Sequence, residues 1–184
     1  MGGVPHLNGA IPLTGDPAAD DLLAEEPLAL LIGMLLNQQT PMERAFYGPY
    51  ELKQRLGGRL DVGEIAAADP AALAAAFAEA PALHRAAGAM AARTQELCRT
   101  VVDDYGGDPA AVWSTARSGQ ELFDHLCALP GFGAHKARVL MILLSDHLGV
   151  APAGAADITG PYRDREFFSI APAPKKLVDG RWTR

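Results

Sequence analysis

The chain has 184 residues, a formal net charge of -6 and a hydrophobic content of 49%, which is enough for a buried core. No apolar stretch approaches the length of a membrane span, and no basic segment followed by an apolar run opens the chain. We therefore expect a cytoplasmic protein without a membrane partner. Cys98 and Cys127 are too few for a disulfide scaffold or an iron-sulfur cluster, so no such cluster is expected.

The charge is unevenly distributed along the chain. Negative net charge argues against a protein that coats DNA phosphates, because non-specific DNA binding depends on Lys and Arg. Residues 131–184, however, carry a formal charge of +3, whereas residues 1–130 carry -9. The carboxyl-terminal part is therefore the basic part of the chain, which weakens the argument from net charge.

Turn and capping residues predict an all-α protein, interpreted as a single domain over residues 1–184. Residues 1–26 are expected to form an amino-terminal arm and lead-in, because the first 15 are rich in Gly and Pro. A helix is predicted from Pro27 to Asn37, and since it is apolar nearly all round it should be central.

Thr40 is expected to cap the next helix, with Pro41 at its first position. That helix should run toward Arg55 and bend near residues 48–49. Further helices complete a bundle over residues 27–128. They are predicted from the start signals Asp61 with Glu64, Asp69-Pro70, Asp108-Pro109 and Ser118 with Glu121, and from the long apolar pattern over residues 83–104.

Residues 129–149 are predicted to form two helix ends joined by a hairpin, in the string Leu-Pro-Gly-Phe-Gly-Ala-His-Lys-Ala that begins at Leu129. The glycines permit a tight turn, while Phe132 can fix the turn against a core. The helix that follows should begin near Ala134, where its free N-H groups could bind an anion beside Lys136. A plain helix-to-helix connector is the alternative interpretation.

Residues 150–184 are expected to be mostly irregular and basic, with loops and one short helix, because prolines and charges cluster there.

Three amide side chains, Asn37, Gln38 and Gln39, lie at the end of the apolar helix that is predicted from Pro27 to Asn37. Buried amides are costly unless paired, so these three should lie at a surface or a cleft. Capping of the helix end is the alternative role.

The hairpin string resembles the helix-hairpin-helix of the base-excision DNA glycosylase superfamily named for helix-hairpin-helix, Gly/Pro and Asp (HhH-GPD). The Leu-Pro-Gly-x-Gly-x-x-x-Ala order matches the pattern of that family position by position, and the amide loop precedes it in the family's order. The resemblance covers residues 27–160. It implies a two-lobed helical fold, with the hairpin and the amide loop on opposite rims of a cleft, acting as a monomer on double-stranded DNA that contains a damaged base.

The resemblance also implies which residues meet DNA. Gln39 would fill the gap left by a flipped base, and Gln38 would support its loop. The hairpin residues implied to bind DNA are Leu129, Gly131, Phe132, Gly133, His135 and Lys136. For His135, simple solvation at a helix start is the alternative. A structural monovalent cation is implied at the backbone carbonyls of Cys127, Leu129 and Phe132.

Asp157 is the best match to the family's carboxylate, which stabilises the cation-like sugar as the base departs. It follows Leu129 by 28 residues, a few more than the family pattern has, and residues 158–161 interrupt the regular helix that the family places there. An ordinary turn capped by Asp157 is the alternative.

Two departures from the family narrow the expected chemistry. His135 stands where members that also cleave the strand carry a Schiff-base Lys, and Lys136 lies about 100° further round the helix. Met34 replaces the Glu of adenine-removing members. We therefore expect a monofunctional glycosylase that hydrolyses the N-glycosidic bond. The alternatives are a non-catalytic helix-hairpin-helix DNA-binding module and, given the acidic residues 1–130, a helical protein-interaction domain.

Overall fold

The computed structural model describes residues 11–163, 176–178 and 181–183. The helices are α1 (Pro17–Glu25), α2 (Pro27–Leu36), α3 (Met42–Arg55), α4 (Val62–Ala67), α5 (Pro70–Ala78), α6 (Ala87–Tyr105), α7 (Ala111–Ser114), α8 (Gly119–Ala128), α9 (Ala134–Leu148) and α10 (Ala155–Arg163). The strands β1 (Lys176–Val178) and β2 (Arg181–Thr183) pair antiparallel, with Leu177 opposite Trp182. The predicted helical fold is confirmed, and the short strand pair is an addition that we did not predict.

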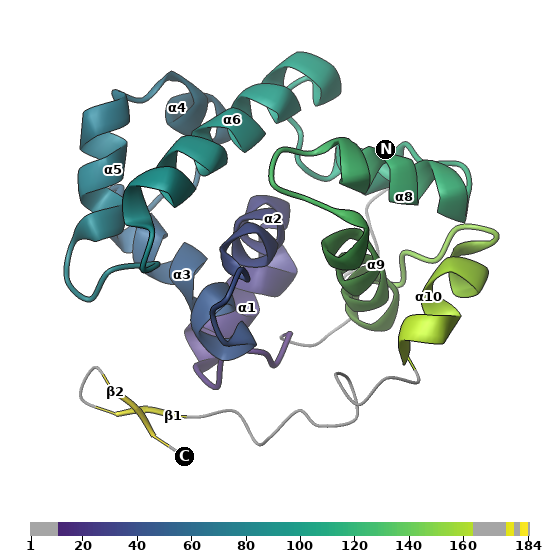
Figure 1. Cartoon of the computed structure of the whole chain (residues 1–184), viewed down its shortest axis with the longest axis horizontal. Helices are drawn as coiled ribbons and strands as arrows, with labels where there is room; N and C mark the ends of the chain where they lie inside the picture. Colours follow the sequence, from purple (N-terminus) through teal and green to yellow (C-terminus); the bar gives the residue numbers. More distant parts are fainter. Residues whose placement is uncertain (1–10, 164–175, 179–180, 184) are drawn as a thin grey trace.

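Helix α2 lies at the centre of the molecule, as its apolar composition predicted. In Figure 1, α4, α5 and α6 lie on one side of it and α8, α9 and α10 on the other. Every residue of α2 from Leu28 to Leu36 is buried. Gly33 lets the Phe46 ring of α3 approach closely, since a Cβ atom at Gly33 would lie 2.5 Å from that ring. The two groups of helices therefore share one core through α2.

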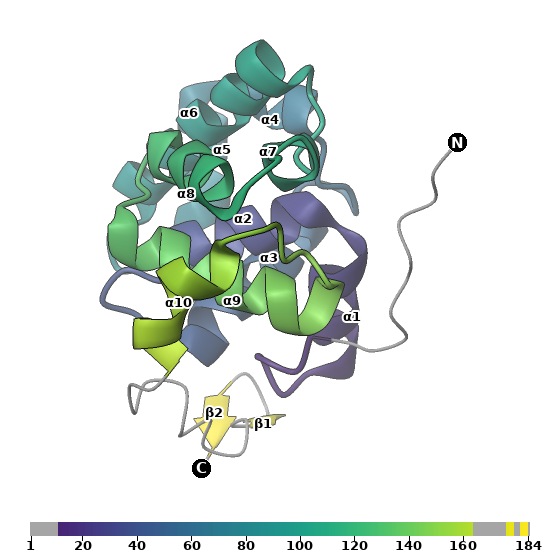
Figure 2. The same ribbon diagram turned by 90° about the vertical axis from the view of Figure 1, so that its right-hand side faces the viewer.

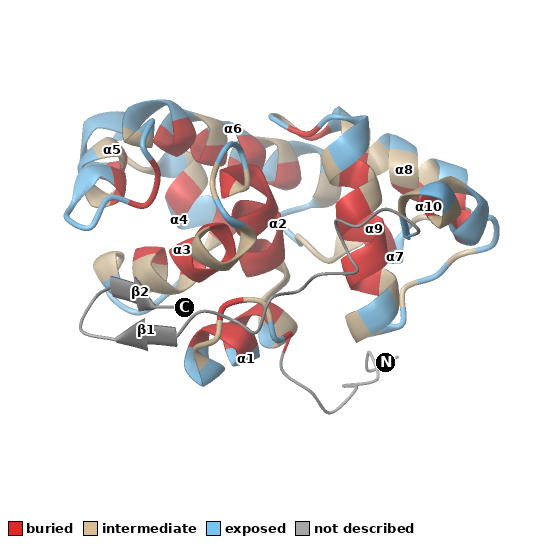
Figure 3. Ribbon diagram, turned by 60° about the horizontal axis from the view of Figure 1, so that its bottom comes forward, coloured by how far each residue is buried: buried red, intermediate tan, exposed pale blue. Residues whose placement is uncertain are grey.

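Helix α9 is the second buried helix, and Figure 3 shows its buried residues beside those of α2. Ala137, Leu140, Met141 and Leu144 form the predicted buried face. Val139, Ile142 and Leu143 are buried as well, because α8 and α10 pack on its other sides. The boundaries of α9 agree with the prediction, and Gly149 ends it in the left-handed conformation at φ 66°.

Three of the predicted helix starts are confirmed by side-chain caps. The Asp61 carboxylate accepts a hydrogen bond from the backbone N-H of Glu64 at 2.8 Å. The Asp69 carboxylate accepts a hydrogen bond from the Ala72 N-H at 2.9 Å, and the Ser118 hydroxyl oxygen accepts one from the Glu121 N-H at 3.1 Å. Each cap satisfies an N-H group that the helix itself leaves without a partner.

The predicted cap of α3 is wrong. Pro41 occupies the capping position, without a side-chain hydrogen bond, and Met42 is the first helical residue. The Thr40 hydroxyl lies 3.4 Å from the Gln38 carbonyl oxygen, so it is directed back toward the preceding loop. The helix also continues through Pro49 to Arg55.

The two ends of the chain contain more helix than predicted. Helix α1 lies within the segment interpreted as a lead-in, where the Asp16 carboxylate caps the N-H group of Ala19 at 3.0 Å. Helix α10 continues through residues 158–161, where we expected an interruption. The remaining parts of the two terminal predictions, residues 1–10, 164–175, 179–180 and 184, lie outside the described residues.

Helix α6 begins at Ala87, four residues later than the apolar pattern predicted, because residues 80–86 form a loop. His84 of this loop contacts Gln38, which follows α2. Within the described residues, no helix is both long enough and apolar enough to cross a membrane.

Candidate nucleic-acid interface

The hairpin between α8 and α9 is a tight turn centred on Gly131. Gly131 has φ 77°, a left-handed conformation that glycine adopts without steric cost. The N-H group of Phe132 donates to the Leu129 carbonyl at 3.1 Å, and both side chains are buried. Because Ala137 N-H is the first to bond back, to Gly133, the N-H groups that open α9 have no acceptor within the helix. Free N-H groups at the start of a helix can bind an anion.

The hairpin touches the carboxyl-terminal end of α2 at Leu35. A Cβ atom added at Gly131 would lie 2.5 Å from the Leu35 Cδ1 atom, so only glycine permits this approach. The Lys136 ammonium donates a hydrogen bond to the Leu35 carbonyl oxygen at 2.9 Å. Burial, together with the positive charge of Arg93, lowers the pKa of Lys136 to about 8. We call this pair of contacts the Leu35 junction.

The amide loop, residues 37–40, leaves α2 directly after the Leu35 junction and is held by a second set of contacts. The Arg93 guanidinium of α6 donates to the Gln38 side-chain oxygen at 2.9 Å. The His84 ring accepts the Ala86 N-H on Nδ1 at 2.9 Å, so its Nε2 atom carries the proton and donates to the Gln38 carbonyl at 2.8 Å. Gln38 is therefore fixed from both the 80–86 loop and α6.

Gln39 has an unusual backbone conformation. It is exposed and has φ 56°, the only positive value among the non-glycine residues that the structure describes. A side chain in this conformation costs roughly 1–2 kcal/mol. The neighbouring Asn37 amide donates to the Thr40 carbonyl at 3.0 Å and closes the loop beneath Gln39. The loop thus presents Gln39 to solvent on a constrained backbone.

A pocket of about 440 Å³ lies between the amide loop and the start of α6. It is lined by Gln38, Gln39, His84, Arg85, Ala86, Ala89, Met90 and Arg93. Two of these residues are arginines, and none is acidic. This local positive charge contrasts with the net negative charge of residues 1–130 and suits a phosphate backbone. We call this surface the basic groove.

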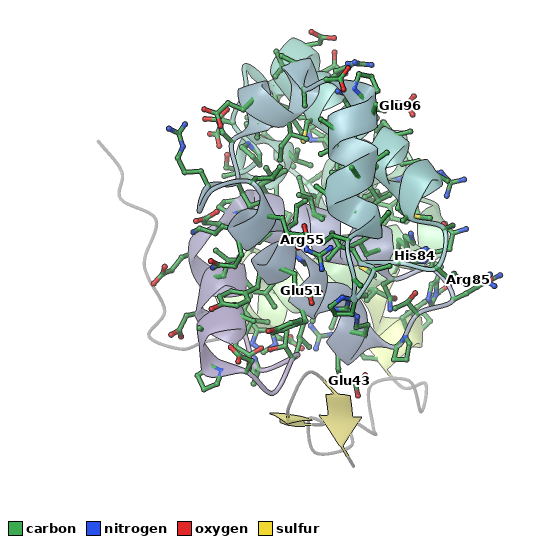
Figure 4. The ribbon with its side chains drawn as sticks, turned by 90° about the vertical axis from the view of Figure 1, so that its left-hand side faces the viewer. Glu43, Glu51, Arg55, His84, Arg85 and Glu96 are labelled. Carbon is green, nitrogen blue, oxygen red and sulfur yellow. The ribbon has the colours of Figure 1, made fainter. Side chains whose placement is uncertain are left out.

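The 80–86 loop is held in place by arginines of α3. Arg44 donates to the Ala82 carbonyl and Arg55 to the Pro81 carbonyl, each at 2.8 Å. Glu51 forms ion pairs with both arginines. Figure 4 shows Arg55 and Glu51 within the helical body and Arg85 projecting outward at the edge of the molecule. Arg85 is thus an exposed cation on an anchored loop.

Asp157 lies in the first turn of α10 and is exposed. It lines a pocket of about 370 Å³ with Gln120, Phe123, Arg138, Ile158, Pro161 and Tyr162. Figure 2 shows α10 in front of α8 and α9, the elements that supply these residues. The His135 ring of the hairpin helix lies 5.7 Å from the Tyr162 ring, between ring centroids, so the pocket adjoins the first turn of α9.

The predicted site residues therefore fall into two groups. Gln38, Gln39, Gly131 and Lys136 gather around the Leu35 junction and the basic groove. Asp157 lines the other pocket, which none of the residues of the basic groove shares. Its catalytic role stays a prediction.

We did not single out His84, Arg85 and Arg93 from the sequence. A usable signal was present, because Ala89, Met90 and Arg93 recur at helical spacing on one face of α6, after Ala86 at its capping position. The contact of His84 with Gln38, 46 positions earlier, could not be read from any local pattern.

The predicted cation site consists of backbone oxygens alone. The Leu129 carbonyl already accepts the Phe132 N-H, and its second lone pair leaves room for a cation. The carbonyls of Cys127 and Phe132 would complete a set of hard oxygen donors. The residues present fit a monovalent cation, and the site stays a prediction.

No protein-family model matches this sequence, and no curated protein matches it. Among solved structures, a non-covalent endonuclease III-DNA complex matches with a TM-score of 0.50 and 22% identity, over 78% of this chain and 57% of that chain. The chain therefore shares the helical fold of that endonuclease III chain over the aligned residues. The alignment covers most of this chain but leaves more than two fifths of the endonuclease III chain without a counterpart.

Two further glycosylase structures are similar at lower scores. A trapped endonuclease III-DNA covalent intermediate matches with a TM-score of 0.48 and 21% identity, over 68% of this chain and 49% of that chain. A thermostable thymine-DNA glycosylase matches with a TM-score of 0.46 and 19% identity, over 64% and 46%. The chain thus spans about half the length of the solved structures that it matches.

Proposed function

We propose that this chain binds duplex DNA containing a damaged base and hydrolyses the N-glycosidic bond of that base. The observation that carries the proposal is the Leu35 junction, which brings the hairpin and the amide loop together beside a groove without acidic residues. Phosphates of one strand would meet the free N-H groups of the hairpin. Arg85 and Arg93 would meet phosphates on the other side of the amide loop. Gln39 would occupy the space of the extruded base.

In the proposed reaction Asp157 stabilises the positive charge that develops on the sugar. A water oxygen bonds to C1′ and the water loses a proton, while the bond between C1′ and the base nitrogen breaks and the departing base takes up a proton. The position of Asp157 in a pocket that adjoins His135 supports this role, because an extruded nucleotide must leave the duplex close to the hairpin.

The experiment that tests the proposal measures free base released from duplexes that carry uracil, alkylated purines or oxidised guanine. The native chain is compared with Asp157→Asn and, as a matched control, with Asp103→Asn on the exposed end of α6. Release that Asp157→Asn abolishes and Asp103→Asn preserves supports hydrolysis with this carboxylate. Equal release by all three proteins rejects the role of Asp157.

We also propose that the enzyme is monofunctional and does not cleave the DNA strand. Formation of a Schiff base requires a lysine amine that is free to attack C1′. The usual position holds His135, and the Lys136 amine is bound to the Leu35 carbonyl. Borohydride treatment during the reaction should therefore trap no covalent protein-DNA adduct. An adduct that disappears in Lys136→Met would overturn the assignment.

One observation favours the second candidate, a non-catalytic DNA-binding module. Asp157 lines a different pocket from Gln39, so binding and chemistry could have been separated in this chain. Duplex binding without base release from any lesion would support the module. A helical interaction protein, the third interpretation, predicts that bulky residues at Gly131 and Gly133 leave duplex affinity unchanged.

A further inference from the structure

The pocket beside α10 holds two opposite charges that are not paired with each other. Arg138 and Asp157 both line it, yet the ion pairs of residues 11–163 include none between them. Nearby, Arg163 and Asp146 do form an ion pair at 2.7 Å. A positive donor and a negative acceptor that face one pocket without pairing can both bind a ligand that presents complementary groups.

The Arg138 guanidinium is fixed in orientation. Its central carbon lies 4.8 Å from the Phe123 ring centroid and 5.0 Å from the Tyr162 ring centroid. These cation-π contacts use the faces of the guanidinium and leave its edge for hydrogen bonds. One edge nitrogen donates to the Ala134 carbonyl at 3.3 Å. The remaining N-H groups form a fork that can donate two parallel hydrogen bonds.

The acceptors of the pocket lie on the neighbouring helices. Asp157 of α10 offers a carboxylate, which as an ion accepts hydrogen bonds only. Gln120 of α8 donates its amide to the Asp124 carboxylate at 2.8 Å, and its side-chain oxygen is left as a second acceptor. The pocket therefore combines a fork of donors with two acceptors. Its volume of about 370 Å³ is within the range of small-molecule sites.

We propose that this pocket binds an extruded 6-oxopurine, with hypoxanthine as the substrate. The inference rests on the proposed glycosylase function and specifies its substrate class. The O6 and N7 atoms of a 6-oxopurine accept the two hydrogen bonds of an arginine fork, as guanine does in the major groove. Its N1-H group donates to the side-chain oxygen of Gln120, so Asp157 remains available to the sugar. Adenine presents an amino group beside N7 and would oppose the Arg138 donors.

Two other damaged purines fit this arrangement poorly. In 8-oxoguanine N7 carries a hydrogen, so a donor faces the donors of Arg138. In 7-methylguanine the ring is cationic and N7 is blocked, and Arg138 repels the charge. Normal guanine has the right edge but is held more firmly in its base pair, which makes its extrusion more costly than that of a mispaired hypoxanthine.

The test compares release of hypoxanthine, 8-oxoguanine and uracil from otherwise identical duplexes. Native protein is expected to release hypoxanthine at least about ten-fold faster than the other two bases. Arg138→Lys keeps the charge but removes the fork, and it should lower hypoxanthine release by about ten-fold. Arg117→Lys, at an exposed arginine outside the pocket, is the matched control. Thermal melting followed by circular dichroism checks that each variant is folded.

A titration with free nucleosides keeps the inference testable without catalysis. Inosine should shift the NMR signals of the Gln120 amide, and adenosine at the same concentration should not. Release of 8-oxoguanine or uracil in preference to hypoxanthine overturns the inference and leaves the proposed function standing. If no base is released, equal shifts by inosine and adenosine overturn it. Shifts by inosine alone, abolished in Arg138→Lys, support the pocket even in a non-catalytic protein.

Discussion

Lys136 of the hairpin helix donates a hydrogen bond to the backbone carbonyl of Leu35, 101 positions earlier in the chain. The contact joins the first turn of α9 to the last turn of α2, from which the amide loop extends. The bond satisfies a carbonyl in the last turn of α2, where the helix itself supplies no donor. Together with the close approach of Gly131 to Leu35, this bond joins the amide loop to the hairpin.

Replacing Lys136 with Met should weaken duplex binding by about ten-fold, because the amide loop and the hairpin would no longer be held in one geometry. Fluorescence anisotropy with a labelled duplex measures the change. Arg59→Met, which removes an exposed cation that lines another pocket, controls for the loss of charge. Equal losses in both variants would assign the effect to net charge rather than to the Leu35 junction.

The Leu35 junction should also make stability depend on pH. The pKa of Lys136 is about 8 in the folded protein, whereas the ordinary value for lysine, expected in the unfolded chain, is 10.5. At a pH between these two values the unfolded chain therefore binds more protons than the folded protein. The free energy of unfolding therefore gains a contribution that rises with pH from about 8 to about 10.5. Burial raises the pKa of Cys98 to about 12, which acts in the opposite direction above pH 9.

Urea denaturation at a series of pH values isolates the Lys136 contribution as the difference between native protein and Lys136→Met. The native protein should gain stability relative to the variant as the pH rises through this window. A constant difference from pH 7 to pH 10 would show that Lys136 keeps an ordinary pKa.

The two hairpin glycines should respond differently to substitution. Gly131→Ala places a methyl group against Leu35 at a positive φ, and we expect a loss of about 1–2 kcal/mol in unfolding free energy. A Cβ atom added at Gly133, the residue that caps α9, would meet no other atom within 4 Å. Gly133→Ser should therefore keep or raise stability while its hydroxyl competes with phosphate for the free N-H groups.

Thermal melts and duplex titrations of both hairpin variants separate the two effects. A Gly133→Ser protein that binds duplex as tightly as the native chain would show that these N-H groups do not hold a phosphate.

Two substitutions at Gln39 separate the proposed role of its side chain from the strain of its backbone. Gln39→Gly should stabilise the fold by about 1 kcal/mol, because glycine adopts φ 56° freely, whereas Gln39→Ala should not. Both variants should reduce base extrusion several-fold, since neither can fill the gap in the duplex. The fluorescence of 2-aminopurine placed at the lesion reports extrusion. Unchanged fluorescence in both variants would exclude Gln39 as the wedge.

The sequence predicted those features that depend on neighbours in the chain. The caps at Asp61, Asp69 and Ser118 and the boundaries of α9 follow from side chains three or four residues apart. The central position of α2 followed from its composition, because a helix that is apolar all round must be surrounded. The hairpin string likewise indicated its own geometry, since Gly131 requires a positive φ.

Tertiary packing decided what local patterns could not. At Thr40 a good capping residue lost its role because Pro41 begins the turn of α3. At residues 158–161, a segment with Gly and Pro became helical, since Thr159 is buried and its hydroxyl donates to the Ala155 carbonyl at 3.0 Å.

The helices between residues 27 and 149, the hairpin and the exposure of Gln38 and Gln39 follow from local sequence, because each depends on residues a few positions apart. Only the tertiary structure placed His84 and Arg93 on Gln38, and Lys136 on Leu35. It also placed Arg138 and Asp157 in a shared pocket away from Gln39. These pairings depend on how buried faces of distant helices pack, and no local spacing encodes that packing.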